Sequence, residues 1–171
     1  AFGASEDADR LAGGLMPVQN WYAPSLTSAH EAGVAGWPRG DVVALLRDGT
    51  SARGSAAGPM AEVVLGSTQY LSATDLDAMA VYLQSLPVTD DLALEAAGPQ
   101  DEAVRARAAR LYADHCSDCH GERGEGVKGI YPALAGNRAV TMNPPANPLR
   151  IVLGGGFAPA TAGNPRPFGM P

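Results

Sequence analysis

The chain has 171 residues, which suits one domain of ordinary size or two small ones. Its formal charge of -6 at pH 7 argues against nucleic acid as a partner, because no basic stripe is available to neutralise phosphates, and no run of about eighteen apolar residues exists to span a membrane. The 21 glycines and 14 prolines, with only 6% aromatic residues, predict a modest protein core that a large apolar cofactor would complete.

The first half of the chain predicts short helices separated by loops. Residues 1–33 are dense in glycine, proline and serine, and we expect a loop there with Trp21-Tyr22-Ala23-Pro24 as its bulky anchor. Apolar residues at helical spacing, bounded by capping residues and by glycine or proline, predict three helices. These are Pro38 to Gly49, Met60 to Leu65 and Thr74 to Leu86, with Ser72 or Thr74 as N-cap of the last and a loop over 50–59.

The second half of the chain follows a predicted linker over 91–100, which contains Gly98-Pro99. A strong helix is predicted from Asp101 into Cys116, and a loop over 121–147. Asn147 as N-cap and Pro148 as first helical residue predict a last helix, which ends at Gly154-Gly155-Gly156. No stretch alternates apolar and polar residues as a strand does, so we expect a mainly α fold with long ordered loops.

The most informative stretch is Cys116-Ser117-Asp118-Cys119-His120. Two thiols followed at once by a histidine at this spacing are typical of c-type haem attachment: each cysteine adds to one vinyl group of the porphyrin, and the imidazole binds the iron. The chain has no other cysteine, so it can attach one haem in this way.

The motif has three other interpretations. A disulfide would close too short a loop to be useful. A zinc site that included His30 or His115 would need a second ligand pair at finger-like spacing, and the sequence has none. A thioredoxin-like redox pair would follow a strand, whereas a helix is predicted before Cys116.

A methionine thioether usually completes a low-spin haem iron whose other ligand is histidine. Met142 and Met170 are the candidates after the motif. We favour Met170, because its rigid neighbours in Pro167-Phe168-Gly169-Met170-Pro171 would hold it in place, and we keep Met142 as the alternative. Gap-filling in a core is the competing interpretation of either methionine.

Two segments place methionine beside proline and glycine after a short helix and a glycine-rich loop. They are Gly58-Pro59-Met60 and Phe168-Gly169-Met170-Pro171. The first is followed by a predicted helix but has no CxxCH motif before it, and the second has the motif before it but no helix after it. The pattern indicates one module used twice, with each copy incomplete.

The order and spacing of these motifs resemble the cytochrome c subunit of membrane-bound bacterial alcohol dehydrogenases. Gluconate and aldehyde dehydrogenase complexes share this family, whose chains carry three c-type haem domains in tandem. The resemblance covers nearly all of the chain. Motifs similar to the second haem domain lie at 20–27, 58–64, 69–72 and 80–87, and motifs similar to the third lie at 116–120, 131–137 and 151–157.

The resemblance implies tandem class I-type cytochrome c domains. Residues 1–90 would be the C-terminal part of one domain without its CxxCH motif, and residues 101–171 would be the next domain without its last helix. The family's first haem domain has no counterpart in this sequence, so we interpret the chain as part of a longer protein.

The resemblance also implies iron ligands. Met170 would be the distal ligand of the haem on His120. Met60 would be the distal ligand of a second haem whose cysteines lie before Ala1.

Further residues would contact the haem if the resemblance holds. The carbonyl of Pro132, next to Tyr131, would accept the Nδ1 proton of His120 and fix the ring, with a simple loop proline as the alternative. Candidates to reach haem propionates are Trp21, Tyr22 and Arg138, with surface anchoring or a solvated charge as the alternative.

The expected function is electron transfer, because iron with histidine and methionine ligands has both axial positions filled and cycles by one electron. The resemblance implies a quinoprotein-type alcohol or sugar dehydrogenase subunit as electron donor and ubiquinone as acceptor, with membrane association through partners or missing segments. Covalent haem attachment takes place outside the cytoplasm, so we expect a periplasmic location, peripheral to the cytoplasmic membrane. A peroxidase-type haem enzyme with an open distal site and a structural metal module are the rival hypotheses.

A chain that starts inside a domain would leave that domain poorly packed. We expect residues 1–87 to surround a poorly filled space with Leu45, Leu65 and Leu83. Each side chain left exposed forgoes about 1.5–3 kcal/mol of burial, so this half is expected to be less stable than the half that contains Cys116.

Overall fold

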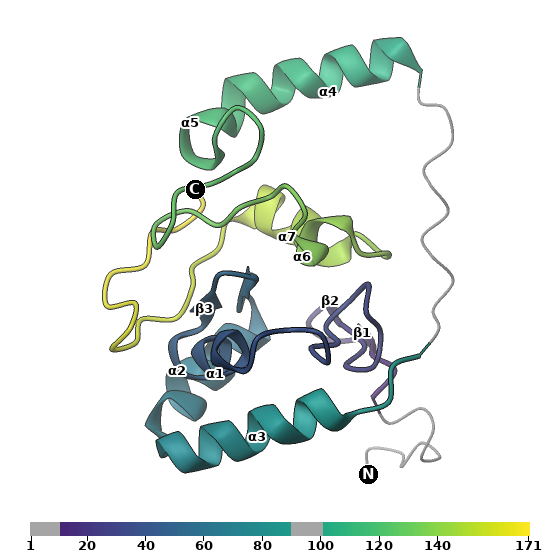
Figure 1. Ribbon diagram of the computed structural model, residues 1–171. Helices are drawn as coiled ribbons and strands as arrows, with labels where there is room; N and C mark the ends of the chain where they lie inside the picture. The colour runs from purple at the N-terminus through teal and green to yellow at the C-terminus, as the bar shows by residue number, and fades with distance from the viewer. Residues whose placement is uncertain (1–10, 90–100) are drawn as a thin grey trace.

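Helices from the two halves of the chain make up most of the regular structure (Figure 1). The computed structural model describes residues 11–89 and 101–171, so the linker predicted over 91–100 and the first ten residues of the predicted N-terminal loop lie outside the described residues. The first half contributes α1 (Arg39–Asp48), α2 (Pro59–Gly66), the short 3-10 helix η1 (Thr68–Tyr70) and α3 (Ala73–Ser85). The second half contributes α4 (Glu102–His115), α5 (Ser117–His120), α6 (Arg138–Thr141) and α7 (Ala146–Gly154). The expectation of a mainly α fold is confirmed.

The three helices predicted in the first half are confirmed, with ends within one residue of those expected. Gly49 ends α1 in the left-handed region (φ 74°), where its N–H donates to the Leu45 carbonyl. Pro59 opens α2, a position where a proline loses no helical hydrogen bond. The Ser72 side chain accepts a hydrogen bond from the Asp75 N–H and so begins α3.

The main buried cluster lies in the first half. α1 and α3 pack together through four side chains that are at most 6% exposed, Val42, Leu46, Leu76 and Ala80. Leu83 packs against this cluster. α1 therefore covers much of the apolar face of α3, but Leu83 also lines a cavity of about 370 Å³, so the expectation of a poorly filled space is not contradicted at Leu83. Leu65 on α2, in contrast, is 47% exposed.

Two small antiparallel hairpins lie in segments predicted as loops, so the expectation of a chain without strands is wrong. β1 (Gly14–Met16) pairs with β2 (Trp21–Ala23), and β3 (Thr50–Ser51) pairs with β4 (Gly54–Ser55). Asn20, just before β2, takes the left-handed conformation (φ 54°) that tight turns use. Strands of two or three residues are too short to show an alternating pattern in a sequence.

The second half departs from the prediction at α6 and at the start of α7. α6 forms one turn inside the loop predicted over 121–147. α7 has Pro145 as its N-cap, so the prediction that Asn147 caps it is wrong. The Asn147 side chain instead bonds to the backbone of Tyr22, accepting from its N–H (2.9 Å) and donating to its carbonyl (2.8 Å). The Asn147 side chain is therefore engaged in a contact with the first half of the chain and does not cap α7.

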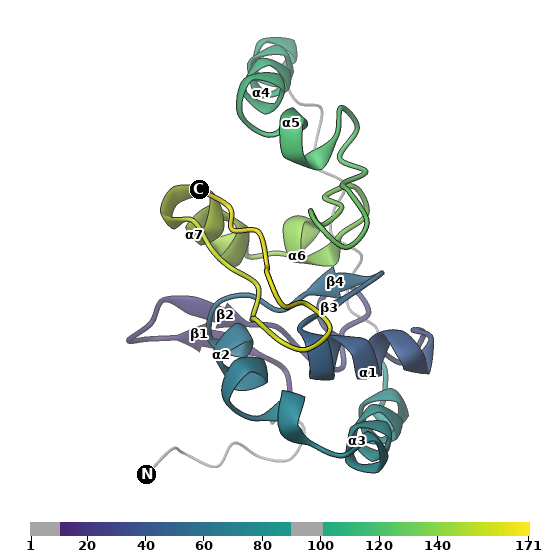
Figure 2. The ribbon, with the colours of Figure 1, turned by 90° about the vertical axis from the view of Figure 1, so that its left-hand side faces the viewer.

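The end of the chain runs along the first half. Figure 2 shows the segment after α7 passing beside β3 and α1 before it returns to the C terminus near α7. At the far end of this segment, Thr161 Oγ1 donates to the Asp48 carbonyl at 3.1 Å. The two halves are thus joined by direct contacts as well as by the chain between them.

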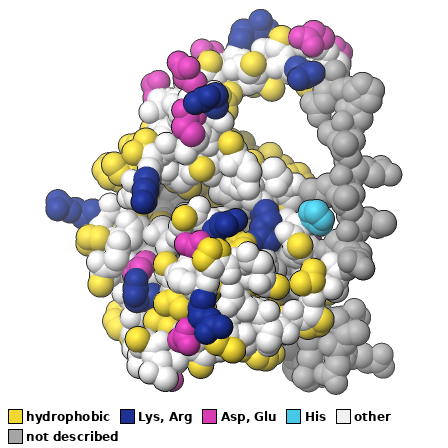
Figure 3. All heavy atoms as spheres, in the orientation of Figure 1, with side chains coloured by type: hydrophobic (Ala, Val, Ile, Leu, Met, Phe, Trp, Pro, Cys, Tyr) yellow, Lys and Arg dark blue, Asp and Glu magenta, His cyan; other side chains and the backbone are white. Residues whose placement is uncertain are grey.

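On the face seen in Figure 3, acidic side chains gather at the upper left, around α5 and the end of α4, whereas acidic and basic side chains are interspersed over the rest of the face. Within residues 11–89 and 101–171, no helix is long and apolar enough to cross a bilayer. The same residues contain no group of three or more His, Cys, Asp or Glu side chains placed to hold a metal ion.

Candidate functional site

The two cysteines lie where α4 passes into α5. The Cys116 N–H donates to the Tyr112 carbonyl and the His120 N–H donates to the Cys116 carbonyl, both at 2.9 Å, so the turn of α5 follows directly from α4. Cys116 is half-buried, Cys119 is exposed, and both thiols are free rather than joined in a disulfide. One short helix therefore presents two thiols and an imidazole together.

The His120 ring is held through one of its two nitrogens. Its Nδ1 lies 2.9 Å from the carbonyl oxygen of Pro132, which can only accept, so Nδ1 carries the proton and donates it. The side chain is nearly enclosed, with 9% of the residue exposed. In the neutral ring, Nε2 is then the nitrogen whose lone pair can bind a metal ion. The structure thus brings together the two residues that the resemblance paired.

The loop after α5 folds back so that Pro132 reaches His120. The Gly126 N–H donates to the His120 carbonyl at 2.7 Å. Gly126 has a left-handed φ of 67°, and a Cβ there would lie 2.6 Å from the Tyr131 carbonyl oxygen. Only glycine fits where two stretches of backbone approach so closely.

Met170 lies at the base of the C-terminal loop, residues 156–170, where it pairs with Gly156. Phe168 of the same loop contacts Tyr131, whose ring lies near that of His120. Met170 and Gly156 exchange two backbone hydrogen bonds, of 2.8 and 3.1 Å. Phe168 meets Tyr131 edge to face with ring centroids 5.5 Å apart, and the Tyr131 ring lies 6.4 Å from that of His120. In Figure 2 the C terminus lies beside α7, with α5 above it and to one side.

Met142 has a different environment. It directly follows α6, donates its N–H to the Arg138 carbonyl and is 6% exposed among the buried apolar residues. Such burial is typical of a methionine that fills a core. It favours Met170 over Met142 as the candidate iron ligand.

Tyr131 connects the motif to the C-terminal loop. Partial removal from water raises the pKa of its hydroxyl, and the neighbouring Cys119 thiol raises the pKa further. The hydroxyl therefore stays protonated throughout the neutral range, where it can donate a hydrogen bond.

Many apolar side chains on the elements around the motif are largely exposed. Neither α4 nor α7 buries a residue. Those exposed by 46% or more include Leu111, Ile130, Leu149, Val152, Leu153, Phe157 and Phe168. Soluble proteins seldom leave so many apolar side chains uncovered on neighbouring elements. Two thiols, an imidazole with a free Nε2 and these apolar walls together fit a haem.

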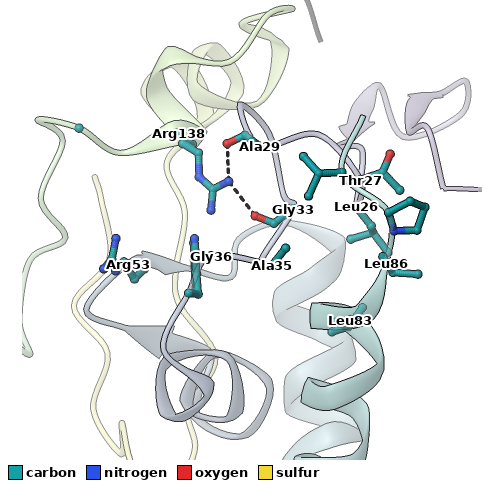
Figure 4. A pocket seen from close by; sticks show the side chains of 14 residues that line it. Leu26, Thr27, Ala29, Gly33, Ala35, Gly36, Arg53, Leu83, Leu86 and Arg138 are labelled. Carbon is teal, nitrogen blue, oxygen red and sulfur yellow. Dashed lines mark hydrogen bonds between the residues drawn. The ribbon is translucent and has the colours of Figure 1, made fainter. Parts of the chain in front are cut away.

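Arg138 lies at the contact between the two halves. Its Nη1 donates to the carbonyls of Ala29 (2.6 Å) and Gly33 (2.8 Å), and its guanidinium lies 5.0 Å from the centre of the Trp37 ring (Figure 4). Burial lowers the pKa of Arg138, and the charge of Arg53 lowers it further. Both arginines border a cavity of about 370 Å³ that reaches into the first half.

Trp21 and Tyr22, the other candidates for propionate contact, lie at the same contact between halves. Arg150 of α7 lies 5.1 Å from the centre of the Trp21 ring, and a Cβ on Gly58 would overlap that ring. No motif in the sequence pointed to Trp37. The one feature of the sequence that could have singled it out is that tryptophan is rare, because Trp21 and Trp37 are the two tryptophans of the chain. In the structure, each of them lies beside an arginine of the second half.

Met60 lies in the first half, at the start of α2, and is 44% exposed. Figures 1 and 2 show α2 well apart from α5, so the structure does not bring Met60 to the motif at 116–120. This placement agrees with a role separate from that of Met170.

Comparison with known proteins gives consistent matches. Residues 105–171 match the cytochrome c family. The chain is 37% identical to the cytochrome c subunit of alcohol dehydrogenase (quinone) from Gluconobacter oxydans, a match that covers all of this chain and 37% of that protein. It is 32% identical to the fructose dehydrogenase cytochrome subunit of Gluconobacter japonicus (81% of this chain, 33% of that protein) and 33% identical to the gluconate 2-dehydrogenase cytochrome c subunit of Pantoea cypripedii (95% and 39%).

The chain spans between a third and two fifths of the length of these relatives. The cytochrome c family implies covalently attached haem c, and the motif at 116–120 lies inside the matched residues. Residues 105–171 are thus a cytochrome c domain, and the chain is a homologue of the cytochrome c subunits of alcohol, fructose and gluconate dehydrogenases.

Proposed function

We propose that the protein is an electron-transfer cytochrome c without catalytic activity of its own. The observation that carries the proposal is the hydrogen bond from His120 Nδ1 to the Pro132 carbonyl, which leaves Nε2 available beside two free thiols. A bound haem c supplies one-electron chemistry at its iron. The residues of the chain supply the attachment, the axial ligands and an apolar enclosure.

Each residue of the motif has a separate task in this proposal. Cys116 and Cys119 would hold the haem through thioether links to its two vinyl groups, and His120 Nε2 would bind the iron. Pro132 keeps the proton on Nδ1, which orients the ring and makes Nε2 a better electron donor. Met170 would hold the iron as its second protein ligand, which would leave the iron no open position for a substrate.

The same proposal assigns the remaining candidates. Tyr131 closes the wall beside His120, next to Phe168. The propionates would be reached from the contact between the halves by Trp21, Tyr22 and Arg138.

We further propose that residues 1–90 and 101–171 belong to tandem class I-type cytochrome c domains. Met60 would then be the distal ligand of a second haem. Support comes from α2, where Met60, Val63 and Leu65 are 44–47% exposed, so an apolar surface next to the methionine is uncovered there as it is on α7.

The relatives support a physiological setting for the whole protein. We propose that it accepts electrons from the catalytic subunit of a quinoprotein-type alcohol or sugar dehydrogenase and passes them towards ubiquinone. The complex would work in the periplasm, held at the cytoplasmic membrane by partners or by further segments of the protein.

Covalent attachment is tested by a haem stain after denaturing electrophoresis and by the mass of the intact chain. We expect one haem per chain, at most one thioether link in Cys119→Ser, and none when both cysteines are replaced. An unstained chain would refute the proposal.

Carbon monoxide separates electron transfer from the peroxidase-type alternative. Iron with two axial ligands from the protein binds carbon monoxide poorly, whereas an open distal site binds it at once. Rapid binding to the unsubstituted ferrous protein would favour the enzyme.

A further inference from the structure

The loop that carries Met170 has backbone hydrogen bonds both at its base and at its tip. At its base, Met170 and Gly156 exchange two backbone hydrogen bonds. At its tip, Thr161 and Asn164 exchange two backbone hydrogen bonds of 3.1 Å, and the Asn164 N–H also lies 3.2 Å from Thr161 Oγ1, which accepts. The tip is therefore a turn of fixed shape.

The tip contacts the first half of the chain rather than the half to which it belongs. Thr161 is 6% exposed, and its Oγ1 donates to the Asp48 carbonyl at 3.1 Å. Pro159 lies against Gly49, and Gly163 lies against the Asp48 side chain, so closely that a Cβ on either glycine would overlap its neighbour. The end of α1 thus offers a fitted contact for the tip (Figure 2).

Asp48 is itself fixed. Arg47 donates two hydrogen bonds to its carboxylate, of 3.0 and 2.7 Å, and Asp48 is 8% exposed. The Ala56 N–H donates to the carbonyl of the next residue, Gly49, at 2.7 Å. The contact for the tip is therefore held by Arg47 and by Ala56, the residue after β4.

We propose that the Thr161–Asp48 contact positions Met170, so that ligation of the iron on His120 depends on the first half of the chain. The inference rests on the proposed function, in which Met170 is the distal ligand. Thr161 is a positioning residue that acts through the loop. A tip that has lost its contact leaves the loop fixed only at its base, and the thioether then leaves the iron more often.

Threonine variants of the haem-loaded full chain test this. Thr161→Val removes the hydroxyl and keeps the branched shape, and Thr161→Ser keeps the hydroxyl. Thr74→Val, at an exposed position of α3, is the matched control. The rate at which the ferrous protein binds carbon monoxide measures the population in which the thioether has left the iron, and the reduction potential is a second measurement.

We expect Thr161→Val to bind carbon monoxide about fivefold faster, the equivalent of about 1 kcal/mol for one hydrogen bond, and to have a lower reduction potential. Thr161→Ser and Thr74→Val should match the unsubstituted protein. If Thr161→Val does not fold, Pro159→Ala, which trims the contact with Gly49, should give a smaller change in the same direction.

Met170→Ala separates this inference from the proposed function. If Met170→Ala opens the iron while the Thr161 and Pro159 variants leave it closed, the positioning role is refuted and the ligand assignment stands. If Met170→Ala leaves the iron closed, Met170 is not the ligand, and both proposals about it are overturned.

Discussion

The Pro132 carbonyl decides which nitrogen of His120 is free to bind iron. The motif at 116–120 predicts an imidazole beside two thiols, but the acceptor that sets the tautomer lies twelve positions further along the chain. Resemblance to a family pointed to Pro132, whereas nothing in the sequence pointed to Gly126, whose backbone lets the loop return. Residue types at short spacing can be recognised in a sequence, but the turn that brings a distant carbonyl into place cannot.

Gly126→Ala should destabilise the haem-loaded protein more than Gly129→Ala. Both glycines have left-handed φ angles, 67° and 75°, so both changes cost about 1–2 kcal/mol in backbone strain. Only at Gly126 would the new Cβ also meet backbone, at 2.6 Å from the Tyr131 carbonyl oxygen, because Gly129 has open space around it. Thermal unfolding measures the difference, and equal losses would show that the close approach is unimportant.

Met170→Ala should convert a low-spin haem spectrum to a high-spin one and lower the reduction potential, because the thioether stabilises reduced iron. Met142→Leu is the control. It nearly preserves the volume of a side chain that is 6% exposed and should cost less than about 1.5 kcal/mol, with spectrum and potential unchanged. A high-spin Met142→Leu beside a low-spin Met170→Ala would transfer the ligand assignment to Met142.

At the scale of elements, α3 and α4 have equally clear helical patterns in the sequence but different surroundings. α3 buries Leu76 and Ala80 against α1, while α4 buries no residue. Apolar spacing indicates that a helix has a face to cover, but not what covers it. The apolar face of α3 packs against another helix, α1. In our proposal, the apolar face of α4 packs against the haem. The hairpins and Asn147 were missed for a related reason, since tertiary contacts decided their structure.

In the chain without haem, the backbone amides of α3 should exchange with solvent more slowly than those of α4. Exchange is slow where a helix is packed in a core, and α3 has the buried cluster that α4 lacks. This reverses the stability order expected from the sequence. Hydrogen exchange read by mass spectrometry on the full chain measures both helices, and loading with haem should protect α4 more than α3. Equal protection of the two helices without haem would contradict the explanation.

At the scale of the whole molecule, polar side chains of the second half bond to backbone groups of the first. Arg138 donates to the Ala29 and Gly33 carbonyls, and Asn147 pairs with the backbone of Tyr22. These partners lie 105 to 125 positions apart in the chain. A polar residue on a helix gives no sign of which distant carbonyl it will meet, so the arrangement of the halves was not predictable, although the longer helices and the haem motif were.

Arg138→Ala should weaken the contact between the halves far more than Arg150→Ala does. Each arginine lies beside a tryptophan ring, at 5.0 and 5.1 Å, but only Arg138 also donates to two backbone carbonyls, which its removal would leave unpaired. We expect a loss of about 2–4 kcal/mol in the free energy of unfolding for Arg138→Ala and about 0.5–1 kcal/mol for Arg150→Ala.

Urea unfolding of the haem-free chain measures both variants, with tryptophan emission as the signal, because Trp21 and Trp37 are the two tryptophans and both lie at this contact. Arg105→Ala, at an exposed position of α4, is the control for loss of a positive charge. It should change the free energy of unfolding by less than about 0.5 kcal/mol. Losses of equal size in the Arg138 and Arg150 variants would mean that stacking on tryptophan, rather than the bonds to Ala29 and Gly33, holds the two halves together.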